Sequence, residues 1–308
     1  MKQKLVSRIF TLIAMGVLIL DSRHGAESAW EGIELCIRTV IPSLFPFFVL
    51  NIYLTGNIGT SNAAASVILS GFFGGYPVGA QAAADNFRRH RLTRVQANRM
   101  LMFCSQAGPA FLFGMASQQF PEGKYGWYLW AIQLLSAVSV AALLPKSKMP
   151  HGKTEENTGI SLADAMKNAL RAISSVCGWV VLFRVIGRYV SLFPLGNLWN
   201  TLICGMLELT NGCLKLSSVE NPELRFLAAA VMLNFGGLCV LAQTLSVAKE
   251  LDVRYYVSGK LLQTCFCIPY ALVFLGHWQP VIPVFTLILL LRRGFPAKRG
   301  SIPATVGV

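Results

Sequence analysis

Long apolar stretches alternate with short polar segments along the whole chain. A helix needs about 20 apolar residues to cross a bilayer, and the stretches near that length predict eight transmembrane helices, the last of marginal length. They are residues 5–20, 37–56, 95–117, 126–144, 164–190, 222–245, 256–276 and 280–291. No segment between them is long enough for a soluble domain. The pattern therefore predicts an all-α membrane protein.

Two further apolar runs, near 61–85 and 195–220, break before they could cross a bilayer. The first contains GGYP at 74–77 and the second contains ELTNG at 208–212. Backbone that unwinds at membrane depth is tolerated only inside protein or beside a watery cavity. Such interruptions at matching places in two halves are typical of a transporter's binding site. We therefore expect two re-entrant hairpins, the second turning at its Thr-Asn-Gly stretch.

The distribution of charge predicts the orientation of the helices. The net charge is +13, and Lys and Arg accumulate in cytoplasmic loops, so the charge indicates a lipid bilayer as partner and no nucleic acid. Five basic clusters fall on one side only if the hairpin at 61–85 enters from the cytoplasm and the hairpin at 195–220 enters from outside. Both termini are then cytoplasmic. The clusters are Lys2/Lys4/Arg8, Arg88/Arg89/Arg91/Arg94/Arg99, Lys146/Lys148/Lys153 with Lys167/Arg171, Lys249/Arg254/Lys260, and Arg292/Arg293/Lys298/Arg299.

The order of features is repeated in the two halves, and this predicts an inverted duplication. Each half runs as a long helix, a broken hairpin, a glycine-interrupted helix and a closing helix. The predicted units are a signal-anchor helix at 1–27, a first Gate-like repeat at 28–144, a cytoplasmic linker at 145–160, a second inverted repeat at 161–276, and a C-terminal helix with a basic tail at 277–308. A cleavable signal peptide is the alternative for the first unit.

The sequence offers no catalytic or metal-binding arrangement. It lacks HExxH, GxSxG and GxxxxGK[ST] motifs, and its eight cysteines are dispersed through apolar stretches without a CxxC pair. We therefore expect no enzyme activity, no metal and no cofactor. A coupling proton or cation is left open.

Three motifs in order resemble a known family of membrane proteins. They are GGYPVGA at 74–80, RMLMFC at 99–104 with a following Gly-Pro, and ELTNG at 208–212. The chain resembles the nucleoside-recognition (Gate) domain membrane proteins over about 28–280, and among them the family of the sporulation integral membrane protein YlbJ. The resemblance implies a helix–hairpin plan similar to that of concentrative nucleoside transporters. It also implies movement of small metabolites, such as dipicolinate, during spore formation.

These observations lead to a functional expectation. The chain is expected to be a multi-pass protein of the cell membrane, acting as a secondary transporter or permease for a small polar metabolite that is anionic (dipicolinate-like) or nucleoside-like. Two alternatives are a non-transporting scaffold in spore or envelope assembly, and a Gate domain that serves a partner complex. A homo-oligomer is left open.

Candidate substrate-binding residues follow from the positions of polar groups near the expected hairpin tips, where helix N-termini attract anions. For the polar side chains on the interrupted helices, interhelical hydrogen bonding is the alternative reading. The candidates are Gly75, Tyr76, Pro77, Gly79, Gln81, Ser105, Gln106, Arg184, Glu208, Thr210, Asn211, Gly212 and Asn234.

Three charged residues allow more specific expectations. Arg184 lies deeper in its span than Arg188, so Arg184 is expected to face the cavity while Arg188 snorkels to the interface. Glu208 is expected to couple a proton or cation, to bind substrate hydroxyls, or to pair with Arg184. Residues 79–92 are expected to form an amphipathic helix on the cytoplasmic surface.

Overall fold

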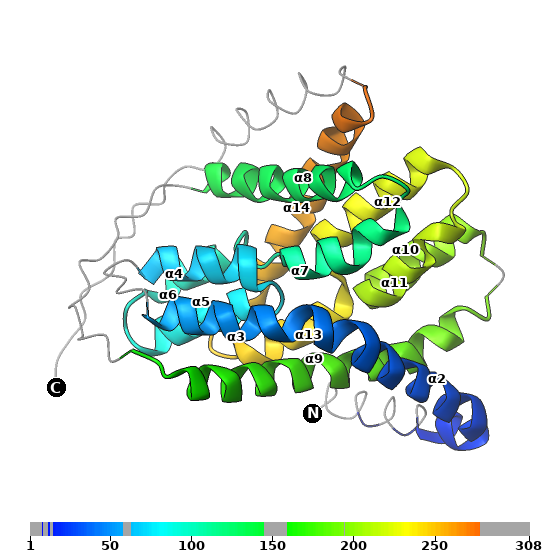
Figure 1. Ribbon diagram of the computed structural model, residues 1–308, viewed down its shortest axis with the longest axis horizontal. Helices are drawn as coiled ribbons and strands as arrows, with labels where there is room; N and C mark the ends of the chain where they lie inside the picture. The colour runs from blue at the N-terminus through cyan, green and yellow to red at the C-terminus, as the bar shows by residue number, and fades with distance from the viewer. Residues whose placement is uncertain are drawn as a thin grey trace.

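The computed structural model describes residues 15–57, 63–144, 159–193 and 195–277, together with Arg8 and Leu12. Within these ranges every regular element is a helix (Figure 1). Five helices are long and apolar enough to cross a membrane: Ser22–Asn57, Lys124–Leu143 (α8), Leu162–Val190 (α9), Pro222–Val247 and Val253–Phe274 (α14). The prediction of an all-α membrane protein is therefore confirmed. Half of the expected span 5–20, most of the linker 145–160, and the span 280–291 with the tail lie outside the described residues.

The segment 21–36, which separates the expected spans 5–20 and 37–56, is helical from Ser22 onward. Helices α2 (Ser22–Leu35), η1 (Cys36–Val40) and α3 (Ile41–Asn57) form one helix of 36 residues. The small residues Gly25, Ser28 and Gly32 share the buried face of α2. A Cβ atom on Gly32 would lie 3.0 Å from the Cα of Val181 in α9. The polar composition of α2 concealed this small-residue packing face, and the expected boundary at 27/28 falls inside the helix.

Both broken segments form helical hairpins, and these enter the molecule from opposite ends (Figure 1). The first pairs α4 (Ala63–Leu69) and η2 (Ser70–Gly74) with α5 (Val78–Arg88), and the second pairs α10 (Asn197–Leu207) with α11 (Leu209–Lys215). The expectation of a surface helix at 79–92 is wrong, because α5 is the returning arm of the first hairpin. Its Ala80, Ala83 and Ala84 are completely buried.

Two helices are interrupted halfway. The expected span 95–117 consists of α6 (Arg94–Leu101), a non-helical stretch, and α7 (Pro109–Phe111) continued by η3 (Leu112–Ala116). The second interruption separates α12 (Pro222–Phe235) from α13 (Gly237–Val247) at Gly236, whose φ is +85°. A left-handed φ of this kind is readily accessible to glycine, so the chain can turn here without a side-chain clash.

Side-chain amides satisfy the carbonyl groups that the first interruption leaves free. Gln263 Nε2 donates to Met102 O at 2.6 Å, and Gln106 Nε2 donates to Phe103 O at 2.7 Å. Gln133 Nε2 donates to Ala107 O at 2.8 Å. Because an unpaired carbonyl at membrane depth costs several kcal/mol, these three glutamines make the non-helical stretch tolerable.

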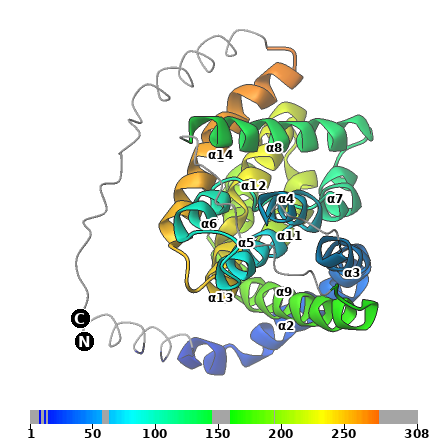
Figure 2. The same cartoon turned by 90° about the vertical axis from the view of Figure 1, so that its left-hand side faces the viewer.

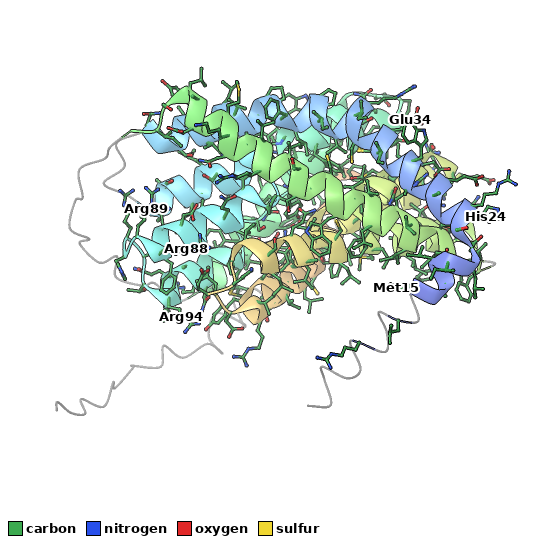
Figure 3. The ribbon with its side chains drawn as sticks, turned by 90° about the horizontal axis from the view of Figure 1, so that it is seen from below. Met15, His24, Glu34, Arg88, Arg89 and Arg94 are labelled. Carbon is green, nitrogen blue, oxygen red and sulfur yellow. The ribbon has the colours of Figure 1, made fainter. Side chains whose placement is uncertain are left out.

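Charged side chains lie at both ends of the helix bundle. Arg88, Arg89 and Arg94 lie at one end, and His24 and Glu34 lie at the other (Figure 3). At the basic end Arg88 binds Glu250, with Nε 3.0 Å from Oε1, and so joins the first hairpin to the turn between α13 and α14. Helices α8, α9 and α14 lie around the hairpins (Figure 2). The hairpins are thus enclosed by long helices.

Glycines allow the arms of each hairpin to touch. A Cβ atom on Gly79 would overlap Cys104 O and would lie 2.6 Å from the Cα of Gly71. In the second hairpin, a Cβ on Gly212 would overlap the Cα of Gly205. Gly79 and Gly212 were expected in the binding site, and the structure gives both of them a packing contact between arms.

We predict that Gly79→Ala lowers the free energy of unfolding by about 1–3 kcal/mol, the usual cost of overpacking, because backbone atoms on two sides leave no room for a methyl group. Thermal unfolding of the purified protein in detergent measures this. Gly178→Ala is the matched control, because a Cβ there has no neighbour within 4 Å and a helix favours alanine by up to about 1 kcal/mol. Equal unfolding temperatures for the two variants would contradict this packing account.

Candidate functional site

The two hairpin tips face a common cavity in the middle of the molecule. The cavity measures about 40 Å³, and it has room for one or two water molecules but none for a metabolite. Both halves of the chain contribute to its wall. The lining residues are Val40, Leu44, Gly74, Gly75, Tyr76, Ala107, Gly108, Phe111, Val176, Val180, Glu208, Leu209, Thr210, Val240 and Gln243.

Hydrogen bonds attach the first tip to the second half of the chain. Gly75 has a φ of +76°, and the Tyr76–Pro77 peptide bond is cis. The buried Tyr76 hydroxyl donates to Leu233 O of α12 at 3.1 Å and accepts from Lys260 Nζ of α14 at 2.9 Å. The tip is therefore held by two helices that lie more than 150 residues further along the chain.

The second tip is built around Glu208, which caps the N-terminus of α11. Its Oε1 accepts from the Thr210 N–H at 2.9 Å, and its Oε2 accepts from the Asn211 N–H at 2.7 Å. A carboxylate at a helix N-terminus is stabilised by these free N–H groups and by the helix dipole. The expected Thr-Asn-Gly turn is wrong, because the chain turns at Glu208 and 210–212 form the first turn of α11.

Arg184 stands beside the second hairpin and bridges two elements. Its Nη1 donates to Asn211 Oδ1 at 2.7 Å, and its Nη2 lies 2.8 Å from Glu31 Oε2 of α2. The direct pair of Arg184 with Glu208, one of the three expected roles, is not formed. Asn211 stands between them, since its N–H binds Glu208 and its side-chain oxygen binds Arg184.

Arg184 and Arg188 both line a recess of about 230 Å³ beside the second hairpin, together with Glu31, Asn211 and Lys215. We call it the outer recess. The expectation that only Arg184 faces a cavity is therefore wrong. Neither arginine lines the central cavity, and three cations against one carboxylate give the recess a positive charge.

A second recess of about 160 Å³ adjoins the first hairpin, and we call it the inner recess. Gln81 lies here rather than at the central cavity, with Asp85 and Arg89 as charged neighbours. Asn168 near the start of α9 lines the inner recess, whereas Arg184 and Arg188 near its end line the outer one. The two recesses therefore lie toward opposite ends of α9.

The polar residues at the two helix interruptions are completely buried. They were expected either to bind substrate or to form interhelical hydrogen bonds. Gln106 donates to Gln263 Oε1 at 2.9 Å, so it forms the interhelical hydrogen bond expected as the alternative. Asn234 donates to Ala230 O, but its Oδ1 has no partner among the described residues, and the same holds for Ser105 Oγ. Buried polar atoms without partners are rare in native proteins, so these two positions keep hydrogen-bonding capacity for a ligand or water.

Lys260 was not among the predicted site residues, because its charge placed it in one basic cluster with Lys249 and Arg254. In the structure Lys260 is 2% exposed and lies in the second turn of α14, against the first hairpin tip. Its position inside the apolar stretch 256–276 could have indicated a functional role, because an ionisable residue within a membrane span is by default a functional hypothesis. Gln243 of the cavity wall was also missed.

The described residues contain no cluster of three or more His, Cys, Asp or Glu side chains that could hold a metal ion. All eight cysteines of the sequence fall in the described ranges, and all are free thiols. The chemistry available at the hairpin tips is therefore that of hydrogen bonds, helix termini and isolated charges.

The chain has a distant relative among curated proteins. It is similar to the sporulation integral membrane protein YlbJ of Bacillus subtilis (strain 168), with 22% identity over 337 aligned residues that cover 88% of this chain and 82% of the relative. No protein-family model matches the chain, and no solved structure matches it. The relative supports the likeness to the YlbJ family and a multi-pass membrane location. The Gate-domain likeness rests on the sequence motifs alone.

We predict that Arg184→Ala destabilises the protein more than Arg188→Ala. Removal of Arg184 leaves Asn211 and Glu31 without their cation, which costs about 1–3 kcal/mol, whereas Arg188 makes no hydrogen bond or ion pair within the described ranges. Thermal unfolding in detergent measures the difference. Identical unfolding of the two alanine variants would show that the bridge through Arg184 does not support the second hairpin.

Proposed function

We propose that the chain is a secondary transporter or permease that moves a small polar metabolite between the two hairpin tips. The observation that carries the proposal is their arrangement. Two hairpins enter from opposite ends and meet at a shared cavity, and each borders a recess near its own end. A solute could pass from one recess to the other if the two hairpins opened in turn.

The proposal includes the inverted-repeat plan with eight membrane crossings, two hairpins and both termini in the cytoplasm. Matching positions support it. Ser70 and Val78 precede Gly71 and Gly79 of the first hairpin and line the inner recess. Cys204 and Asn211 precede Gly205 and Gly212 of the second hairpin and line the outer recess. Two copies of one unit that are inserted in opposite directions would place equivalent residues in the two recesses in this way.

The interruptions correspond as well. A Cβ atom on Gly108 would lie 3.2 Å from Phe73 O, at the end of the first arm of the first hairpin. A Cβ atom on Gly237 would lie 3.0 Å from Gly205 O and 3.5 Å from Leu207 O, at the end of the first arm of the second hairpin. In both halves, a glycine of the interrupted helix thus packs on the carbonyl end of a hairpin arm.

The charges favour an anionic or nucleoside-like solute. The outer recess carries Arg184, Arg188 and Lys215, which would concentrate anions at its mouth, and the buried amide and hydroxyl groups at the interruptions suit the hydroxyls of a nucleoside. The name of the relative places that protein in sporulation, and we extend the same setting to this chain. The competing function is a non-transporting scaffold in spore or envelope assembly, which the small volume of the cavity would also fit.

Uptake into liposomes tests the proposal. We predict that the purified protein takes up radiolabelled dipicolinate or a nucleoside, and that Glu208→Gln reduces this uptake at least tenfold or removes its dependence on the proton or cation gradient. The neutral amide keeps one of the two acceptors that cap α11, so the variant should remain folded with a loss of about 1 kcal/mol. The measurement is made at several pH values and at equal amounts of reconstituted protein.

Uptake that equals that of empty liposomes for every solute tried would favour the scaffold. Uptake by Glu208→Gln with the same rate and the same pH and ion dependence as the parent would remove Glu208 from the mechanism. A variant that fails to fold would indicate that the cap of α11 is the main role of this carboxylate.

A further inference from the structure

Lys260 is a buried lysine, and the partners of its amine among the described residues are neutral. Its Nζ donates to Tyr76 Oη at 2.9 Å and to Gln263 Oε1 at 3.3 Å, and it lies 4.9 Å from the centre of the Tyr76 ring. No carboxylate of the described residues comes within 4.0 Å of it. The amine in this position has lost its water, and no counter-charge favours its protonated form.

A buried charge without a counter-charge is costly. Removing an ammonium ion from water costs several kcal/mol, which neutral acceptors offset only in part. Glu208 does not supply the missing charge, because its carboxylate oxygens lie more than 4.0 Å from Lys260 Nζ. Lys260 is therefore a group that would gain from the arrival of an anion.

Tyr76 is the side chain that joins Lys260 to the central cavity. It lines the cavity, and its hydroxyl is bound to both Lys260 and Leu233 O. Since the cavity holds only about 40 Å³, a metabolite can enter only if at least one hairpin moves. Movement of the first hairpin would carry Tyr76 away, whereas Lys260 would stay on α14, which packs along α8 and α12.

We propose that Lys260 latches the first hairpin through the Tyr76 hydroxyl and that, once this hairpin swings away, the ammonium group pairs with a carboxylate of an anionic solute. The exchange of a neutral partner for a charged one would offset the loss of the latch, so the solute itself would favour the open hairpin. This inference rests on the proposed transport function and selects carboxylates over nucleosides as its solute class.

Two variants distinguish the proposed roles of Lys260, as a latch and as a counter-charge, from a role in packing alone. Lys260→Met keeps the length of the side chain and removes its charge, and an apolar replacement of a buried charge is often neutral or stabilising, so the variant should fold. Tyr76→Phe removes the hydroxyl and leaves the charge in place. Lys249→Met is the control, because Lys249 is exposed.

The first measurement is hydrogen exchange of residues 70–82 by mass spectrometry, which needs no ligand. Loss of the hydrogen bond between Lys260 Nζ and Tyr76 Oη should speed the opening of the hairpin about tenfold in both Lys260→Met and Tyr76→Phe, with no change in the control. Parent-like exchange in Lys260→Met would overturn the latch, whether or not the protein transports anything.

The second measurement is calorimetric binding of pyridine-2,6-dicarboxylate and of the neutral pyridine-2,6-dicarboxamide to the protein in nanodiscs. Lys260→Met should weaken binding of the dicarboxylate by about tenfold to a hundredfold and leave any binding of the diamide unchanged. Tyr76→Phe should bind the dicarboxylate as tightly as the parent or more tightly, because the ammonium group has one competitor fewer. A merely structural contact would weaken both variants alike.

Dicarboxylate binding by Lys260→Met that equals that of the parent would overturn the counter-charge. If the parent protein binds neither probe, the counter-charge role of Lys260 is also overturned. Failure of the proposed function gives a different pattern, in which the exchange and binding results hold but liposomes show no uptake of any solute.

Discussion

Everything in this molecule depends on how broken backbone is accommodated at the depth of a membrane. Carbonyl and N–H groups that leave a helix there find no water to bind, so each must find a partner within the protein. The first interruption uses the amides of Gln106, Gln133 and Gln263, and the second hairpin uses the carboxylate of Glu208. Gln263 lies 161 residues from Met102 in the sequence, so its hydrogen bond joins the second half of the chain to the interruption in the first.

The same constraint places the functional groups. The first hairpin tip is held in place by the hydrogen bonds of Tyr76 with Leu233 O and Lys260, because no regular helix runs through the tip itself. The second tip is held in a similar manner, since Asn211 joins Glu208 to Arg184 and so to Glu31 on α2. Hydrogen bonds of this kind are each worth about 1–3 kcal/mol. Displacement of either tip would therefore break a few hydrogen bonds and no long helix, as the proposed transport would require.

Much of the fold could be predicted from the sequence, because apolar length and glycine or proline interruptions are local signals. The spans at α8, α9 and α14 and both broken segments were predicted close to their observed positions, and the interruption at Gly236 falls within the expected span 222–245. The helical segment 22–36 was missed, since its small polar residues resemble a loop and only the contact with α9 shows their role. The turn of the second hairpin was misplaced by two residues, because Glu208 acts as a helix cap.

The candidate site was predictable only in part. The tip residues Gly75, Tyr76, Glu208 and Thr210 do line the central cavity, whereas Gln81 and Arg184 belong to the recesses on either side. Lys260 escaped notice because its partner lies 184 residues away in the sequence. A basic residue near the start of a span resembles an interfacial lysine until the fold brings a hairpin tip against it.

The proposed transport requires the cavity between the hairpin tips to open to each side of the membrane in turn. Thiol accessibility of Thr210→Cys in a cysteine-free protein tests this opening, because Thr210 lines the cavity and is only 4% exposed. The account predicts that a small membrane-impermeant thiol reagent reacts with this cysteine from either side of a proteoliposome, and that transported solute slows the reaction. Thr201→Cys, buried in the same hairpin but away from the cavity wall, should stay unreactive. A Thr210→Cys protein that resists the reagent from both sides, with and without solute, would contradict the account.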